Sequence, residues 1–200
     1  PQNAALATTY HQHAAYDDYP VVNTTHEGAE LYCQWLGKTL TRLAKGNYLI
    51  TARLPSKKEW MYAAYGGKNA PYPWGGYYLR NSKGCELAHF HQIGEEQLTT
   101  DRQTGETTLL DGSGNRREEK VPGLWHFTVP VTSYFPNSYG LYNMSGNVAE
   151  MLSEKGQFKG GSWASVGYDL RIDVESEYNG EVEASPYIGF RPVISATPVD

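Results

Sequence analysis

Hydrophobic positions recur with helical spacing in the first third of the chain. In one stretch the apolar residues return about every 3.6 residues: Ala29, Tyr32, Cys33, Trp35, Leu36, Leu40 and Leu43. Thr24 and Glu27 have the spacing of a capping box ahead of this run, and Gly46 follows it. The pattern predicts a helix between Thr24 and Gly46.

A second helix is predicted a few residues later. Ser56 and Glu59 form another capping-box pattern after Pro55, and they open the mostly apolar run 59–65. The run stops at Gly66, where a left-handed residue ends a helix at little cost.

The remaining pattern predicts short strands and irregular structure. Residues 131–134, 158–164 and 189–193 are strand-like, whereas Pro and Gly interrupt 68–131. The polar segment 99–120 contains two turn signals and predicts a protruding hairpin or mobile insertion. Residues 1–18 are polar without a clear period and predict an extended arm ahead of one domain over 19–200. The predicted class is α+β with two helices, short twisted sheets and much irregular structure.

Composition excludes several classes of protein. A length of 200 residues favours one domain, and a net charge of −5 provides no basic field for nucleic acid. No apolar run reaches the roughly eighteen residues of a transmembrane helix, and Pro1 without an initiator Met indicates a processed or excised chain. Cys33 and Cys85 lack zinc-site spacing and allow at most one disulfide, with Cys33 expected as a buried, inert thiol.

One short turn carries the chemistry of a cation site. Asn143, Gly146, Asn147 and Glu150 place oxygen ligands around a turn that glycine permits, which is the coordination that calcium prefers. The alternative is a loop that satisfies its own backbone groups with Asn and Ser side chains and needs no ion.

Several motifs occur together in a fixed order along the chain. They are RLPSKKEW (53–60), AAYGG (63–67), YPWG (72–75), PNSYGLYNMSGNVAE (136–150), GGSW (160–163) and GFR (189–191). In this order they resemble the formylglycine-generating enzyme, or sulfatase-modifying factor, family. The resemblance implies a compact, irregular α+β fold related to the C-type lectin fold.

The resemblance also bears on chemistry, position by position. In the oxygen-dependent members, two cysteines after the Gly-Gly-Ser-aromatic motif hold copper(I); the matching positions here are Ser165 and Leu170. Serine is a poor ligand for a soft ion and leucine has no lone pair, so we expect no copper and no oxidase activity. The resemblance further implies one structural calcium ion, whose ligands would be Asn143, Gly146, Val148 and Glu150.

Other candidate sites are weaker. A non-haem iron branch of the family takes its histidines largely from an additional domain, and the pairs His11/His13 and His89/His91 lack a third ligand at suitable spacing. The segments that form the substrate groove of the enzymes carry three tyrosines, which are candidate ligand-binding residues: Tyr168, Tyr178 and Tyr187.

Three hypotheses follow for function. The first is a non-catalytic scaffold or protein-interaction component of an exported or cell-envelope assembly, because residues 13–22 and 72–81 resemble Bacteroidetes members, including lipoproteins of gliding motility and type IX secretion. This predicts a location in the periplasm, outer membrane or cell surface. The second is a lectin-like module that binds peptide or glycan. The third is a non-haem metal enzyme.

Overall fold

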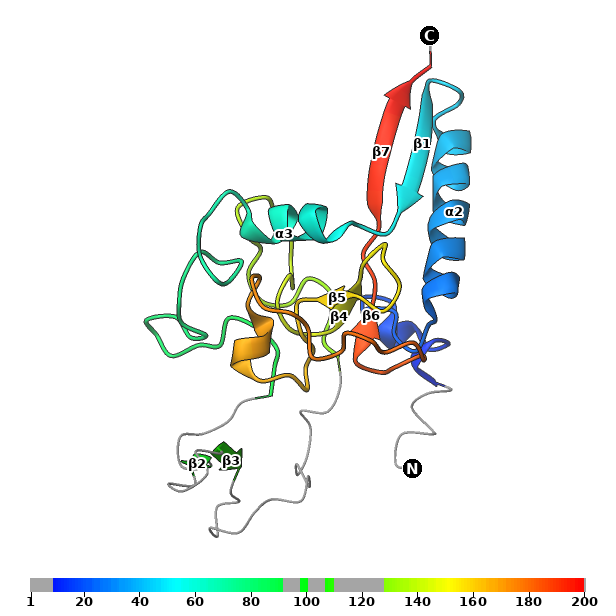
Figure 1. Ribbon diagram of the computed structural model, residues 1–200. Coiled ribbons are helices and arrows are strands. Elements are labelled where there is room, and N and C mark those ends of the chain that lie inside the picture. Colours follow the sequence, from blue (N-terminus) through cyan, green and yellow to red (C-terminus); the bar gives the residue numbers. More distant parts are fainter. Residues whose placement is uncertain (1–8, 92–97, 101–106, 110–127, 200) are drawn as a thin grey trace.

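The computed structural model describes residues 9–91, 98–100, 107–109 and 128–199. The helical elements of this part are η1 (Ala14–Tyr16), α2 (His26–Leu43), α3 (Lys57–Tyr65) and η3 (Gly167–Leu170). Its strands are β1 (Tyr48–Arg53), β2 (Leu98–Thr100), β3 (Thr107–Leu109), β4 (Ala149–Met151), β5 (Phe158–Lys159), β6 (Ile188–Gly189) and β7 (Val193–Pro198). The class is α+β, as predicted, and much of the chain runs as turns and loops (Figure 1).

Helix α2 begins one residue later than its sequence pattern suggests. The cap is Thr25, whose hydroxyl accepts a hydrogen bond from the backbone N–H of Gly28 at 3.1 Å. The predicted capping box at Thr24 is therefore wrong by one position, because adjacent threonines offer the same chemistry. A Cβ at Gly37 would lie 3.0 Å from the Ala52 nitrogen, so glycine here lets the helix lie close against β1.

Helix α3 has both of its predicted ends. The Ser56 hydroxyl accepts from the Glu59 N–H, the Glu59 carboxylate accepts from the Ser56 N–H, and Gly66 ends the helix with φ of 56°. The Asn137 side chain then donates to the Ala63 carbonyl oxygen at 2.7 Å. A turn far along the sequence thus caps this helix from outside.

The strands form three small sheets within the described residues. β1 and β7 pair antiparallel from Tyr48 opposite Pro198 to Arg53 opposite Val193, and α2 packs on β1. Figure 1 shows these three elements projecting together from the rest of the fold. In the second sheet, β4 pairs antiparallel with β5 and parallel with β6. The third sheet pairs β2 with β3 antiparallel, whereas the turn predicted at 104–105 and the remainder of the 99–120 insertion lie outside the described residues.

The strand predictions fail where the backbone turns. Residues 131–134 form a turn in which Tyr134 has φ of 64°, and the predicted strand 158–164 stops at Lys159 because Gly160 and Gly161 have φ of 94° and 65°. The predicted strand 189–193 overlaps the end of β6 and the start of β7. Short apolar runs do not distinguish strands from buried turns.

The predicted N-terminal arm is not extended over its described part, residues 9–18. Tyr10 packs its ring 5.0 Å from that of Tyr16, and its hydroxyl donates to the Pro20 carbonyl oxygen at 2.6 Å. The Val131 N–H donates to the Asp18 carbonyl oxygen at 2.7 Å, which ties the segment to the domain. Contacts between tyrosines therefore fold this polar stretch into a compact turn.

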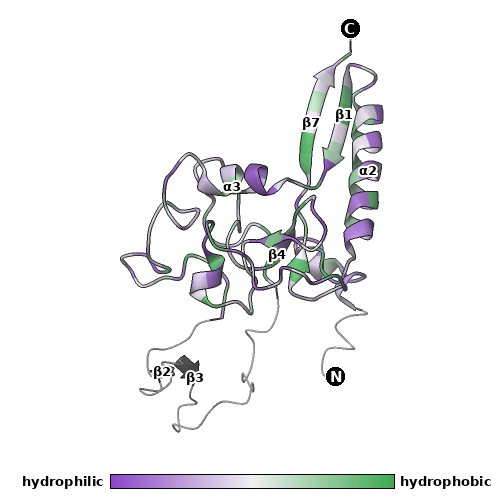
Figure 2. Ribbon diagram, viewed as in Figure 1, coloured by the Kyte–Doolittle hydropathy of each residue, from purple (hydrophilic) through white to green (hydrophobic). Residues whose placement is uncertain are grey.

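Hydrophobic side chains gather in three clusters between these elements. The first lies between α2 and the β4–β6 sheet: Ala29, Cys33, Leu54, Ala149, Met151, Phe158 and Ile188. Trp60 and Met144 lie in the second, under α3, and Tyr72, Ala88 and Leu170 form the third. Cys33 is buried, as predicted, and burial raises the pKa of its thiol. Figure 2 shows that hydrophobic residues also occur on the projecting strands β1 and β7.

The turn before β4 leaves no room for a side chain at Gly146. A Cβ there would lie 2.3 Å from the His89 carbonyl oxygen at φ of 78°, whereas Gly84 has φ of 79° and open space around it. We expect Gly146→Ala to lower the free energy of unfolding by more than about 4 kcal/mol, and Gly84→Ala by only about 1 kcal/mol. Denaturant unfolding of both variants measures the difference. Equal losses would show that backbone strain alone, and not the contact with His89, requires glycine.

Candidate functional site

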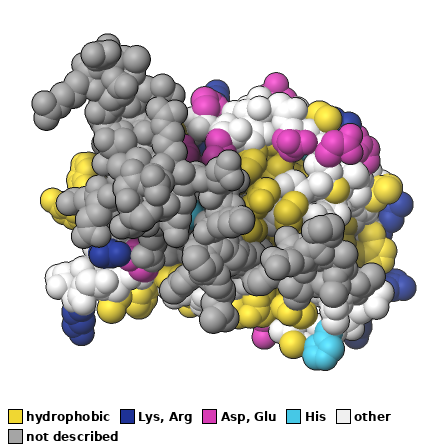
Figure 3. All heavy atoms as spheres, turned by 90° about the horizontal axis from the view of Figure 1, so that it is seen from below, with side chains coloured by type: hydrophobic (Ala, Val, Ile, Leu, Met, Phe, Trp, Pro, Cys, Tyr) yellow, Lys and Arg dark blue, Asp and Glu magenta, His cyan; other side chains and the backbone are white. Residues whose placement is uncertain are grey.

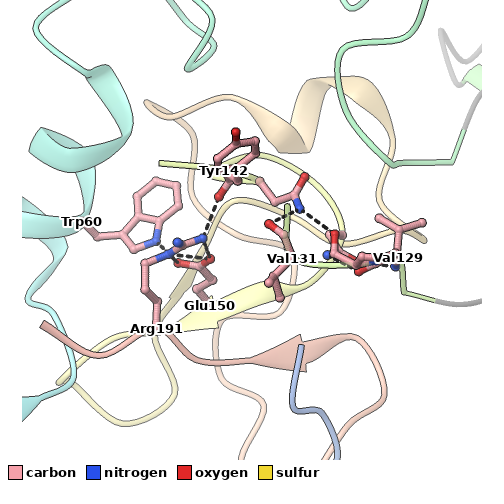
Figure 4. Close-up of polar contacts among 9 residues, drawn as sticks. Trp60, Val129, Val131, Tyr142, Glu150 and Arg191 are labelled. Carbon is pink, nitrogen blue, oxygen red and sulfur yellow. Dashed lines mark hydrogen bonds and ion pairs between the residues drawn. The ribbon is translucent and has the colours of Figure 1, made fainter. Parts of the chain in front are cut away.

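The Glu150 side chain connects residues from three of the family motifs. It projects from β4, is only 4% exposed, and its carboxylate accepts two hydrogen bonds from Arg191 Nε at 3.0 and 3.1 Å and one from Arg191 Nη2 at 2.7 Å. The indole N–H of Trp60 donates to the same carboxylate at 2.7 Å. Figure 4 shows Trp60 and Arg191 converging on Glu150. The carboxylate raises the pKa of Arg191, which keeps the guanidinium charged.

Arg191 extends the contact to the turn before β4. Its Nη2 donates to the Tyr142 carbonyl oxygen at 2.9 Å. The next residue, Asn143, has φ of 50°, and its side-chain N–H donates to the Val131 carbonyl oxygen at 3.0 Å. Asn147 bonds both backbone groups of Val129, accepting from its N–H at 2.9 Å and donating to its carbonyl oxygen at 3.0 Å. The two asparagines hold the 128–131 segment against the turn.

The four predicted calcium ligands differ in how free their oxygen atoms are to bind an ion. Asn143 Oδ1 is buried and has no hydrogen-bond partner among the described residues, which is the state expected of an acceptor that serves a ligand. Glu150, in contrast, is fully engaged by Arg191 and Trp60. Gly146 packs on the His89 carbonyl, and Val148 is buried. Asn143 therefore fits a cation, whereas Glu150 would reach one only by leaving its guanidinium partner.

The two positions that match the copper cysteines contain no thiol. Leu170 is 0% exposed and packs in the third hydrophobic cluster. The Ser165 hydroxyl donates to the Glu177 carboxylate and accepts from the Ser162 N–H at 2.7 Å. Neither side chain is available to a soft metal ion.

Two of the three candidate binding tyrosines come together beside Ser165. The rings of Tyr178 and Tyr187 stack with centroids 6.0 Å apart, and Trp163 lies 4.9 Å from Tyr187. The Tyr178 hydroxyl lies 2.6 Å from that of Ser162, and burial raises the pKa of Tyr178 to about 12. Tyr168 is separate: it is exposed on η3, and the Arg171 guanidinium lies 5.4 Å from its ring centre.

The acidic side chain of Glu177 lies next to Tyr178, and its charge also acts on Asp169. Burial and then the charge of Glu177 raise the pKa of Asp169. No ion pair of either carboxylate is found within the described part of the chain. Figure 3 shows acidic side chains gathered along one edge of the face seen from below, next to hydrophobic ones.

A buried lysine positions the loop that carries Glu177 and Tyr178. Lys159 is 1% exposed, and its ammonium donates to the carbonyl oxygens of Ile172, at 3.1 Å, and Val174. Burial lowers the pKa of Lys159, and the two carbonyls accept from two of its three N–H donors. The charge thus has a structural role that its sequence position did not indicate.

The sequence motifs do not reveal which side chains bind each other in the folded protein. Trp60 and Arg191 both lie in family motifs, and only the fold shows that they bind the same carboxylate, that of Glu150. The contact between the Glu177 carboxylate and the Ser165 hydroxyl has no signature in sequence spacing, and only the fold shows it. His89 is buried, and among the described residues no three His, Cys, Asp or Glu side chains gather as a metal site would require.

Comparisons with known proteins agree on the relationship. Residues 2–196 match the family model of the sulfatase-modifying factor enzyme 1-like domain. The chain is 34% identical over 138 residues to the formylglycine-generating enzyme of Bos taurus, covering 68% of this chain and 27% of that protein. It is 28% identical over 189 residues to the inactive C-alpha-formylglycine-generating enzyme 2 of Bos taurus, covering 87% of this chain and 50% of that protein.

The fold is also shared with solved structures. The Treponema denticola variable protein 1 superposes with a TM-score of 0.54 and 18% identity, over 88% of this chain and 71% of that one. The chain spans between a quarter and a half of the length of the two Bos taurus relatives. Within the described residues, no helix is long and apolar enough to cross a membrane. The ordered motifs, the fold and these matches show that the chain belongs to the formylglycine-generating enzyme (sulfatase-modifying factor) family.

Proposed function

We propose that the chain is a non-catalytic member of its family and serves as a structural or protein-interaction component. The observation that carries this proposal is the pair Ser165 and Leu170. Leu170 is closed into the hydrophobic core, and the Ser165 hydroxyl is bonded to Glu177, so the oxidase positions are used for packing. The similarity to a relative named as inactive supports the same conclusion.

An exposed apolar surface supports the interaction role. We call it the α2–β7 face: the exposed side chains Trp35, Leu43 and Ile194, with Tyr32 between them and the body of the domain. Tyr32 packs its ring 5.5 Å from that of Phe190, shortly before β7, so this flank of α2 is turned toward the strand. Among the described strands β7 pairs with β1 alone, which leaves its other edge open. Open edges beside apolar side chains are typical of surfaces that another segment covers.

The proposed setting is an exported or cell-envelope assembly of the type IX secretion or gliding type. The resemblance of residues 13–22 and 72–81 to lipoproteins of those systems supports it. Calcium is abundant outside cells, where even a weak site fills. We further propose that one calcium ion stabilises the turn at Asn143, whose Oδ1 is buried and finds no hydrogen-bond partner in the part of the chain that the structure describes.

A second candidate function is peptide binding. The stacked rings of Tyr178 and Tyr187 adjoin Glu177, whose charge also acts on Asp169, and this combination favours a basic side chain over a neutral glycan. Tyr168 with Arg171 lies on η3 and is a separate surface.

The absence of oxidase chemistry is directly testable. We expect no oxidation of cysteine-containing peptides by the purified chain, with or without added copper(I), because neither Ser165 nor Leu170 supplies a thiolate. Mass spectrometry of the peptide after incubation in oxygenated buffer measures the product, and an active oxidase of the family serves as the positive control. Product formation above the peptide-only background would refute the non-catalytic role.

The α2–β7 face makes the interaction role testable. We expect Leu43→Glu and Ile194→Glu to remove a partner that the unaltered chain captures from the envelope fraction of its native source. Both side chains are exposed, so the melting temperature should change little. Quantitative mass spectrometry compares the captured proteins with those of Tyr77→Glu, an exposed position outside this face. Identical capture by all variants would exclude the face as the interaction surface.

Calcium should raise the melting temperature. An ion that binds only the native state stabilises it by about 2.7 kcal/mol when its free concentration is about 100 times Kd. We expect this response to be lost in Asn143→Ala and kept in Asn143→Asp, which retains an oxygen at the site. Thermal unfolding in calcium, in magnesium and in chelator measures the shift. A calcium response that persists in Asn143→Ala would place the ion elsewhere.

A further inference from the structure

Two exposed tyrosines from distant parts of the sequence lie in contact. Tyr62 projects from α3 and is 69% exposed, and Tyr139 projects from the 137–141 turn and is 47% exposed. Their ring centroids are 5.6 Å apart with an interplanar angle of 40°. The Tyr139 hydroxyl donates to that of Tyr62 at 3.2 Å, and this bond raises the pKa of Tyr139.

The backbones that carry these rings are fixed to each other. Asn137 donates from its side-chain nitrogen to the carbonyl oxygens of Ala63, at 2.7 Å, and Ala64, at 3.2 Å. Its side-chain oxygen accepts from the Tyr139 N–H at 3.0 Å. Ala63 directly follows Tyr62 and Asn137 lies two residues before Tyr139, so this asparagine joins the end of α3 to the turn close to both rings. The two phenols are held together before any reaction occurs.

We propose that Tyr62 and Tyr139 form an oxidative cross-linking site that yields an intramolecular dityrosine. A one-electron oxidant, such as a peroxidase using hydrogen peroxide, removes one electron and one proton from each phenol. The two phenoxyl radicals couple through a new carbon–carbon bond between ring positions next to the oxygens. Each of these ring carbons then transfers its hydrogen to its own oxygen. The balance is a loss of two hydrogens from the protein and conversion of one hydrogen peroxide to two waters.

Other tyrosines meet only part of this requirement. Tyr77 and Tyr78 are more exposed, but no aromatic contact is found for them in the described part of the chain. Tyr10 lies close to Tyr16, but its hydroxyl is bonded to the Pro20 carbonyl oxygen. Among the tyrosines that the structure describes, only Tyr62 and Tyr139 combine high exposure of both rings with direct contact between their hydroxyls.

The cross-link would join α3 to the turn that leads into the Glu150 region. Residues 62 and 139 would become covalently linked, which restricts the unfolded chain across the long segment between them. The product should therefore unfold at a higher temperature than the unmodified protein. This gives a readout that surface oxidation elsewhere does not produce.

The experiment treats the purified chain at micromolar concentration with a haem peroxidase and hydrogen peroxide. We expect a monomeric product with dityrosine fluorescence, a mass lower by two hydrogens, and a linked peptide pair containing Tyr62 and Tyr139 after proteolysis. Intramolecular coupling should prevail because contacts within one molecule correspond to effective concentrations of about millimolar or more.

Three variants make the assignment specific. Tyr62→Phe and Tyr139→Phe keep the ring packing but cannot couple, so each should lose the linked peptide pair, most of the monomer fluorescence and the rise in melting temperature. Tyr77→Phe should retain all three. Absence of the 62–139 pair at an oxidant dose that modifies Tyr77, or a product linked mainly between molecules, would overturn the proposal.

Discussion

The contact of Glu150 with Arg191 and Trp60 is the interaction on which the central part of the structure depends. A carboxylate that is 4% exposed is costly unless it is paired, and here its oxygens accept from both the guanidinium and the indole. The three residues come from β4, α3 and the segment before β7, and Arg191 also reaches the Tyr142 carbonyl. One buried charge thus joins three parts of the chain that share no local structure.

This arrangement does not involve the two residues that match the copper cysteines of the oxygen-dependent family members. The Glu150 contact, the turn at Gly146 and the Asn147 bonds to Val129 require none of the atoms at Ser165 or Leu170. Leu170 instead adds apolar packing to Tyr72 and Ala88, and Ser165 bonds to the loop that Lys159 holds. The contacts that hold the fold together are therefore made by other residues than the two that match the oxidase cysteines.

One part of the domain surface exposes apolar side chains and a strand edge that the interior would bury. The unit of α2, β1 and β7 projects from the body (Figure 1), and its exposed apolar side chains lie beside an edge of β7 that pairs with no other described strand. Before α2, the tyrosines of residues 9–19 fold a polar segment back onto the domain. Tyrosine thus packs a compact N-terminal segment in one place and forms an exposed pair, Tyr62 and Tyr139, in another.

The sequence by itself determined the features that depend on neighbours in the chain. The capping box at Ser56, the left-handed end at Gly66 and the ordered family motifs are local, because a hydrogen bond to the third residue or a positive φ needs no distant partner. The resemblance to the family also places Ser165 and Leu170 at the positions of the two copper cysteines. Only the tertiary structure decided that Glu150 bonds to Arg191, that Tyr178 stacks on Tyr187 while Tyr168 stands apart, and that 131–134 is a turn. These contacts join residues far apart in sequence, and their geometry is set by packing, which no spacing along the chain encodes.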